Sequence, residues 1–233
     1  MIQAKETKRG VMAQLVLRGL IAPVIIVVLL LLSAGRMDYW QGWVFMGLNM
    51  ALLLVNVWAM RQNPELVQER LKPGEGMKGW DKLYFALTTT LYLALLVVAG
   101  LDVGRFGWTG DLPWGVYVVA VAVYLVGQAI FIWAKQVNRY FSSVVRIQAD
   151  RGQAVCRDGP YRYVRHPGYV GGLLYMLAGS LVLGSLWALG LQALACVLLV
   201  VRTALEDRAL QQELPGYAAY AQQVKYRLLP GVW

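Results

Sequence analysis

Long stretches without a charged side chain constrain this sequence more than any other feature. Charge-free windows run over residues 19–35, 39–60, 83–101, 112–134 and 167–201. A helix needs about 20 predominantly apolar residues to cross a bilayer core of about 30 Å. Each of the first four windows fits one crossing, and the first window extends back through residues 11–17. The sequence therefore predicts an integral membrane protein built from helices.

The fifth window is too long for one crossing. Its 35 residues would form a helix of about 52 Å at about 1.5 Å per residue, which is enough for two short crossings. Gly184 and Ser185 are the natural place for a turn. We expect a helical hairpin with arms near 168–183 and 186–202, and six spans in total.

The expected fold class is all-α: a polytopic membrane bundle of about six spans with a C-terminal hairpin and a short cytosolic helical tail. We divide the chain into four N-terminal spans over 1–134 and a loop, hairpin and tail over 135–233. Both parts belong to one membrane domain. Pro215 and Gly216 should break the tail, 203–233, into two short helical pieces.

The net charge of +9 does not indicate a nucleic-acid partner, because the basic residues gather between the apolar windows. Segment 135–166 alone carries seven basic residues against two acidic ones. Attraction to membrane lipids and the positive-inside rule account for this pattern. We expect both termini in the cytosol and location in the bacterial inner membrane. The oligomeric state stays open.

Neither a metal site nor a disulfide framework is expected. The chain has two cysteines, Cys156 and Cys196, which are 40 residues apart and show no metal-ligand spacing. No small-x-small cleavage site follows the apolar run at 20–32, so we interpret this run as a retained first span rather than a signal peptide.

Candidate chemistry lies at the two ends of the predicted hairpin. His166, the only histidine, stands between Arg165 and Pro167. Proline suits the first turn of a helix, so Arg165 and His166 would lie at a helix N-terminus, which favours an anion. Glu206 and Asp207 would follow the second arm. Because the arms are antiparallel, we expect 165–169 and 202–207 to meet at the cytosolic face.

A structural interpretation of the same residues stays open. Basic side chains beside a span are usually topology signals. A salt bridge from Glu206 to Arg165 or Arg202 could simply close the hairpin. A single histidine near an interface is more often a hydrogen-bonded structural residue than a catalyst.

Two sequence blocks resemble a known enzyme family. The string GPYRYVRHPGYVGG at 159–172 is similar to the Gly-Pro-Tyr-x-x-x-Arg-His-Pro-x-Tyr-x-Gly signature of the isoprenylcysteine carboxyl methyltransferase family and its relatives, the phospholipid N-methyltransferases. A second block is matched by Glu206-Asp207, Tyr217, Tyr220 and Pro230. The likeness covers about 138–230.

The resemblance implies a membrane methyltransferase that uses S-adenosylmethionine. It implies that Glu206 binds the amino group or a ribose hydroxyl of the cofactor. Two departures from the family pattern are an aspartate, Asp207, in place of the second glutamate and the lack of a Gly-x-Gly element. The other residues expected in the cofactor pocket are Tyr163, Arg165, His166, Tyr169 and Gly171.

The expected acceptor is a lipid-like or prenylated small molecule, with a carboxylate favoured by the arginine excess in 139–165. A carboxylate needs a cation to hold it. Arg139, Arg146 and Arg151 are the candidates. Arg146 is our choice as the catalytic residue, with Asn138 as an orienting amide.

Three alternative functions remain open. A phospholipid amine acceptor would need a proton acceptor, for which Glu206 or Asp207 is available. An NADPH-dependent sterol-type reductase shares a similar Arg-His segment, although an Asn-Tyr type sequence typically follows the histidine there. A non-enzymatic membrane binding protein is the third alternative.

Overall fold

The computed structural model describes residues 21, 23–61 and 76–233, and all regular secondary structure in these residues is helical. The bundle consists of α2 (Trp40–Arg61), α4 (Gly79–Gly100), α5 (Trp114–Val137), α6 (Pro167–Val182) and α7 (Leu186–Glu213). A π-helical turn, Leu101–Phe106, continues α4, and the short helix α8 (Tyr217–Gln223) follows α7. Further helical pieces are Pro23–Ala34 and the 3₁₀ turns Ala149–Arg151 and Gly159–Arg162.

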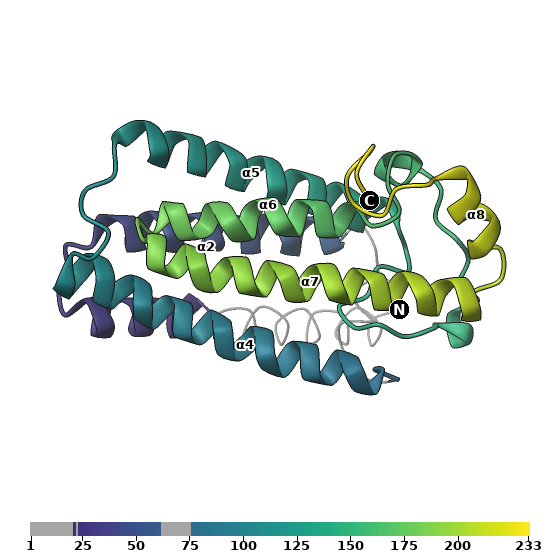
Figure 1. The fold of residues 1–233 in the computed structure, drawn as a ribbon, viewed down its shortest axis with the longest axis horizontal. Coiled ribbons are helices and arrows are strands. Elements are labelled where there is room, and N and C mark those ends of the chain that lie inside the picture. Colours follow the sequence, from purple (N-terminus) through teal and green to yellow (C-terminus); the bar gives the residue numbers. More distant parts are fainter. Residues whose placement is uncertain (1–20, 22, 62–75) are drawn as a thin grey trace, which may run out of the picture.

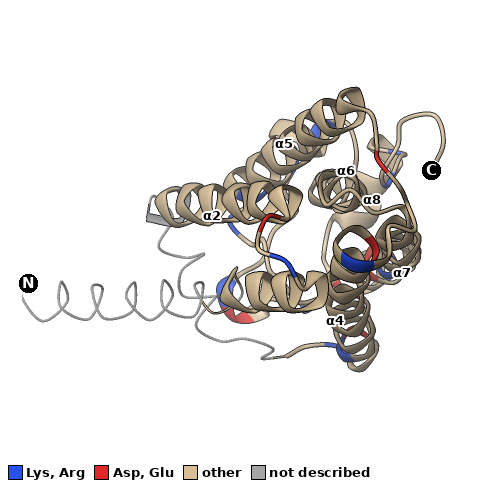
Figure 2. Ribbon diagram, turned by 90° about the vertical axis from the view of Figure 1, so that its left-hand side faces the viewer, with Lys and Arg blue, Asp and Glu red and all other residues tan. Residues whose placement is uncertain are grey.

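The long helices lie side by side along one axis (Figure 1). We call the end with α8 and the C-terminus the tail end, and the opposite end, where α6 turns into α7, the turn end. Viewed along the bundle (Figure 2), α6 lies inward, and it packs against α2, α5 and α7. The outer helix α4 packs along α7. This arrangement confirms the predicted polytopic helical bundle.

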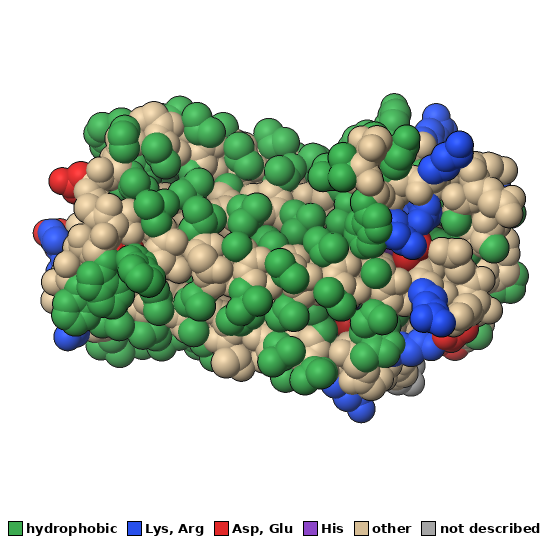
Figure 3. Space-filling model, in the orientation of Figure 1, with side chains coloured by type: hydrophobic (Ala, Val, Ile, Leu, Met, Phe, Trp, Pro, Cys, Tyr) green, Lys and Arg blue, Asp and Glu red, His purple; other side chains and the backbone are tan. Residues whose placement is uncertain are grey.

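Four helices are long and apolar enough to cross a membrane: Trp40–Trp58, Gly79–Phe106, Trp114–Val137 and Leu186–Glu213. The other two predicted spans coincide with the shorter apolar helices Pro23–Ala34 and Pro167–Val182. The first window lies partly outside the described residues. On the face shown in Figure 3, apolar side chains cover the middle of the bundle, and lysine and arginine gather towards the tail end.

The predicted hairpin turn is confirmed at the turn end. Gly184 has a φ of +79°, a left-handed conformation that glycine adopts without steric cost. Ser185 then caps α7, because its hydroxyl accepts a hydrogen bond from the backbone N–H of Ala188 at 3.0 Å. The same hydroxyl donates to the buried carboxylate of Asp102 at 2.5 Å, which ties the turn to the π-helical segment.

The second arm of the hairpin is longer than expected. We predicted its end near residue 202, but α7 continues to Glu213. Residues 203–213 contain no glycine or proline and several strong helix formers, so nothing ends the helix there. Leu214 precedes Pro215, a position that disfavours the helical conformation. Glu206 and Asp207 therefore lie within a continuous helix rather than beyond its end.

Helices α5 and α6 approach each other through two glycines. A Cβ atom built on Gly127 would lie 2.8 Å from the carbonyl oxygen of Gly171, and one on Gly171 would lie 2.4 Å from the carbonyl oxygen of Gly127. Small residues allow such close contact between membrane helices, where packing rather than the hydrophobic effect holds helices together. This contact fixes the position of the N-terminal part of α6, from which the site is built.

Candidate active site

A cavity opens at the tail end, where the two predicted sequence blocks meet. Its cavity volume is about 100 Å³, and all the empty space in it, which includes the open mouth, is about 800 Å³. The loop between α5 and α6, the first turn of α6, the last turns of α7 and helix α8 form its walls. The predicted meeting of 165–169 with 202–207 is confirmed.

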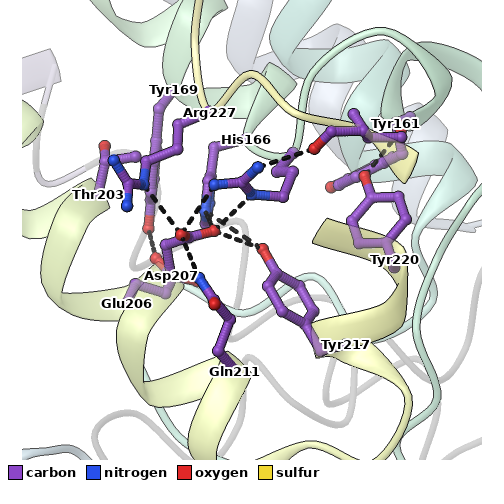
Figure 4. A network of polar contacts seen from close by, with 12 residues as sticks. Tyr161, His166, Tyr169, Thr203, Glu206, Asp207, Gln211, Tyr217, Tyr220 and Arg227 are labelled. Carbon is purple, nitrogen blue, oxygen red and sulfur yellow. Dashed lines mark hydrogen bonds and ion pairs between the residues drawn. The ribbon is translucent and has the colours of Figure 1, made fainter. Parts of the chain in front are cut away.

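Asp207 is the centre of the polar network beside this cavity (Figure 4). Its side chain is fully buried and accepts hydrogen bonds from Arg165 at 2.7 and 2.9 Å and from Tyr217 at 3.0 Å. Arg227 and Gln211 donate to it at 2.9 and 2.8 Å. Nε2 of His166 lies 3.3 Å from the same carboxylate. Two guanidinium groups and the donors on Tyr217 and Gln211 therefore stabilise its buried negative charge.

The C-terminal segment binds the backbone N–H groups at the start of α6, where we expected an anion. The N–H of Arg165 donates to the carbonyl of Tyr226, and the N–H of His166 donates to that of Arg227, both at 2.9 Å. The guanidinium of Arg165 also donates to the carbonyls of Val224 and Lys225 at 2.7 Å. These groups hold the tail against the start of α6, which corrects the expected anion site at that position.

Glu206 faces the cavity and belongs to a second network. The hydroxyl of Tyr169 donates to its Oε2 atom. Arg202 in turn donates to the Tyr169 hydroxyl at 2.8 Å and to Asp81 at 2.7 Å. Asp81 is fully buried and accepts from the backbone N–H of Val145 at 2.7 Å. This network joins α4, α6, α7 and the loop that forms the cavity wall.

The adjacent acids Glu206 and Asp207 belong to different networks and therefore have different roles. The structural ion pairs are Arg165 with Asp207 and Arg202 with Asp81, so the alternative that Glu206 pairs with Arg165 or Arg202 is wrong. Within the described part of the chain, Tyr169 is the only side chain that bonds Glu206, and it contacts one carboxylate oxygen. The other oxygen can therefore accept a hydrogen bond from a ligand.

Aromatic rings border the polar groups. The ring of His166 stacks on Tyr169, with centroids 5.6 Å apart and an interplanar angle of 2°. Tyr161 and Tyr217 also line the cavity. Burial raises the pKa of both hydroxyls well above the usual tyrosine value. Both therefore remain protonated, and able to donate, at physiological pH.

Six of the eight predicted site residues line the cavity, and two lie elsewhere. Tyr163 is 67% exposed and lies outside the cavity wall. Gly171 packs against α5, so its position is explained by helix contact. The residues that line the cavity are Asn138, Arg146, Arg165, His166, Tyr169 and Glu206.

The two residues predicted to act on the acceptor already have partners in the protein. Oδ1 of Asn138 accepts from the backbone N–H of Tyr140 at 3.0 Å, and its amide donates to the Tyr161 hydroxyl at 3.2 Å. Arg146 pairs with Asp150 at 3.0 Å. Asn138 therefore shapes the cavity wall, whereas Arg146 brings a positive charge to it.

Some contributors were not identified from the sequence. Asp81 precedes the charge-free window 83–101, and no local pattern linked it to Arg202, 121 residues away. Arg227 lies beyond the end of α8, in the irregular C-terminal segment. In contrast, Tyr217 and Tyr220 stood in the second sequence block, and the structure places both in the cavity wall.

Comparison with known proteins agrees with this geometry. Residues 119–212 match the family model of the isoprenylcysteine carboxyl methyltransferase (ICMT) family. The matched segment runs from α5 through α6 to the end of α7, and so contains His166, Tyr169 and Glu206. No curated protein matches the chain. Over residues 119–212, less than half of its length, this membrane protein is therefore similar to the isoprenylcysteine carboxyl methyltransferase family, a family of methyltransferases.

Proposed function

We propose that the cavity binds S-adenosylmethionine and that the protein methylates a lipid-like acceptor held at the membrane surface, preferably on a carboxylate. The observation that carries this proposal is the different engagement of the two adjacent acids. Asp207 is saturated by its protein partners, whereas Glu206 faces the cavity with one oxygen available. A carboxylate with one available oxygen, beside stacked aromatic rings, fits a cationic, hydroxylated ligand.

The chemistry of the cavity wall supports this cofactor. S-adenosylmethionine presents an amine, a carboxylate, a ribose diol and a sulfonium. Glu206 would bind the amine or the diol, and the rings of Tyr169 and His166 lie beside it. An aromatic face attracts a cation within about 6 Å of its centroid. The cavity volume of about 100 Å³ is below the usual ligand range of about 300–1,000 Å³, so the ligand would also fill the mouth of the cavity.

The residues of the chain would contribute mainly orientation and exclusion of water. The bound cofactor would supply an electrophilic methyl group. Holding two reactants in line can contribute about 7–11 kcal/mol towards the barrier. The networks around Asp207 and Asp81 hold α4, α6, α7 and the tail in fixed positions, which supports such an orientation.

For the acceptor, the wall favours an anionic group. Of the three candidate arginines, Arg146 is the one whose side chain lines the cavity. A carboxylate needs this cation and partial desolvation, but no general base. An amine acceptor would need Glu206 as its base, because Asp207 is fully engaged. The phospholipid amine therefore remains the second candidate, and the sterol-type reductase and the non-enzymatic binding protein are tested below.

Titration calorimetry with S-adenosylhomocysteine and with NADPH tests the cofactor. Glu206→Gln removes one charged partner without changing side-chain shape. A hydrogen bond to a charged group contributes about 1.5–3 kcal/mol, so affinity for S-adenosylhomocysteine should fall roughly tenfold to a hundredfold. His166→Ala should weaken the same ligand.

Glu213→Gln is the matched control for this titration. Glu213 lies on the same helix but pairs with Lys78 outside the cavity, so its replacement should leave binding unchanged. Tight binding of NADPH without any response to S-adenosylhomocysteine would show a reductase. Binding of neither ligand would favour a non-enzymatic protein.

The stability of the product to alkali tests the acceptor. A methyl ester releases methanol in base, whereas an N-methyl group does not. We therefore expect membranes labelled with radioactive S-adenosylmethionine to release volatile radioactivity in alkali. A product that keeps its label in alkali would exclude the carboxylate and favour the lipid amine.

A further inference from the structure

A second cavity lies inside the bundle, away from the candidate active site. Its volume is about 370 Å³, and residues of α2, α4, α5, α6 and α7 form its wall. No residue lines both cavities. On α6, Tyr169 belongs to the first and Tyr175 to the second, a separation of about 9 Å along the helix axis. The candidate active site therefore does not account for this space.

The wall of this inner cavity carries hydrogen-bonding groups near the middle of the predicted spans. Ser180 is 1% exposed, and its hydroxyl has no hydrogen-bond partner among the described residues. Asn49 and Gln128, which interact with the hydroxyl of Tyr124, also line the cavity, as does Gln192. No acidic, basic or histidine side chain is among the described residues of the wall.

These properties select the kind of molecule that the inner cavity can hold. A polar group buried in an apolar region costs free energy unless it is hydrogen-bonded, and lipid tails offer no partner for Ser180. A charged ligand would find no counter-ion in the described wall, and burying an unpaired charge there is unfavourable. Hydroxyl and amide groups in the wall can both donate and accept, which suits a ligand hydroxyl.

The size of the space sets a further limit. Its volume of about 370 Å³ lies at the lower end of the range of about 300–1,000 Å³ that is usual for small-molecule sites. That is too little for a whole membrane lipid but enough for the hydroxylated end of one. The remainder of such a lipid would extend into the bilayer.

We propose that the inner cavity binds the hydroxyl-bearing end of an uncharged lipid, with Ser180 as a hydrogen-bonding partner. Neither the cofactor nor the methyl acceptor of the proposed function is assigned to this place. Binding there is consequently measurable without any methyl transfer.

Photo-crosslinking tests the proposal with a defined probe. The full-length protein in lipid nanodiscs is exposed to hexadecanol that carries a diazirine near its hydroxyl, and labelled peptides are identified by mass spectrometry. We expect saturable labelling of peptides from α4, α6 or α7 that is competed by unlabelled hexadecanol. Palmitate at pH 9, which has the same chain length and a negative charge, should compete at least tenfold less well.

Two substitutions alter the inner cavity, and a third serves as the matched control. Ala195→Phe fills the cavity from α7, where Ala195 is buried in its wall, and should abolish saturable labelling. Ser180→Ala removes only the unpartnered hydroxyl and should weaken competition by hexadecanol about tenfold, or about 1.4 kcal/mol. Ala193 lies on the same helix but faces outward, so Ala193→Phe should label like the wild type.

Thermal unfolding in detergent distinguishes a loss of lipid binding from a loss of folding. It requires no methyl transfer, so it does not depend on the proposed function. Because the Ser180 hydroxyl has no partner to lose, Ser180→Ala should unfold at the wild-type temperature without added lipid. Unchanged saturable labelling in both cavity variants would overturn the proposal. Equal competition by palmitate would also overturn it. The absence of saturable labelling in the wild type would show that the cavity holds water only.

Discussion

At the scale of single residues, two adjacent acids on α7 have different roles because consecutive helical positions face different directions. Asp207 points to the tail and accepts from Arg165, Arg227 and Tyr217. Glu206 points to the cavity. In the family pattern both acids are glutamates. The shorter side chain of Asp207 fits the buried network in which it lies.

Asp207→Asn should destabilise the protein far more than Glu206→Gln. The change removes the buried charge that two guanidinium groups share, and loss of one partner of a buried ion pair costs about 3–5 kcal/mol. Thermal unfolding in detergent, followed by tryptophan fluorescence, measures both variants. Similar unfolding temperatures for Asp207→Asn and the wild type would show that the network does not hold the tail.

At the scale of elements, the site depends on how closely α6 approaches α5. The start of α6 carries His166 and Tyr169, and its position relative to α5 is set by the contact of Gly127 with Gly171. The opposite end of the hairpin is held by the cap of Ser185 and by Asp102. The hairpin is therefore fixed at both ends and along its inner face.

Gly127→Ala should loosen this arrangement. The added Cβ would lie 2.7 Å from the backbone nitrogen of Tyr175, a contact with backbone that cannot move alone. Overpacking of this kind lowers the free energy of unfolding by about 1–3 kcal/mol, so the unfolding temperature should fall and cofactor binding should weaken. Gly115→Ala is the control on the same helix, because nothing lies within 4 Å of its Cβ position. Equal effects of the two substitutions would contradict the proposed contact.

At the scale of the whole molecule, the distribution of charge predicts orientation. The tail end carries the basic loop 135–166, and the turn end carries few basic residues. The positive-inside rule then places the tail end in the cytosol. The proposed cofactor cavity and the proposed acceptor cation would then both face the cytosol.

Cysteine labelling tests this orientation. In a background with Cys156 and Cys196 replaced by alanine, Asp111→Cys marks the loop at the turn end and Arg162→Cys marks the tail end. Both positions are exposed. A membrane-impermeant maleimide applied to intact cells should label only the former. Labelling of Arg162→Cys alone would reverse the predicted topology.

The sequence by itself determined the fold class, the hairpin with its turn at Gly184, and the meeting of His166 with Glu206. These follow from local signals: apolar windows of span length, a glycine that permits a left-handed turn, and the antiparallel course of two linked helices. The helix end at Glu213 was also readable in principle, from the leucine that precedes Pro215.

The partners of each charged side chain were decided only by the tertiary structure. Arg202 binds Asp81, which is 121 residues away, and Arg227 reaches Asp207 from an irregular tail. Such pairs depend on which helices become neighbours, and a local sequence pattern does not specify these neighbours. The same holds for Gly171, whose place against α5 follows from the contact of two helix backbones. Local patterns specify elements, whereas buried charges take whichever counter-ion the assembled bundle brings within hydrogen-bonding distance.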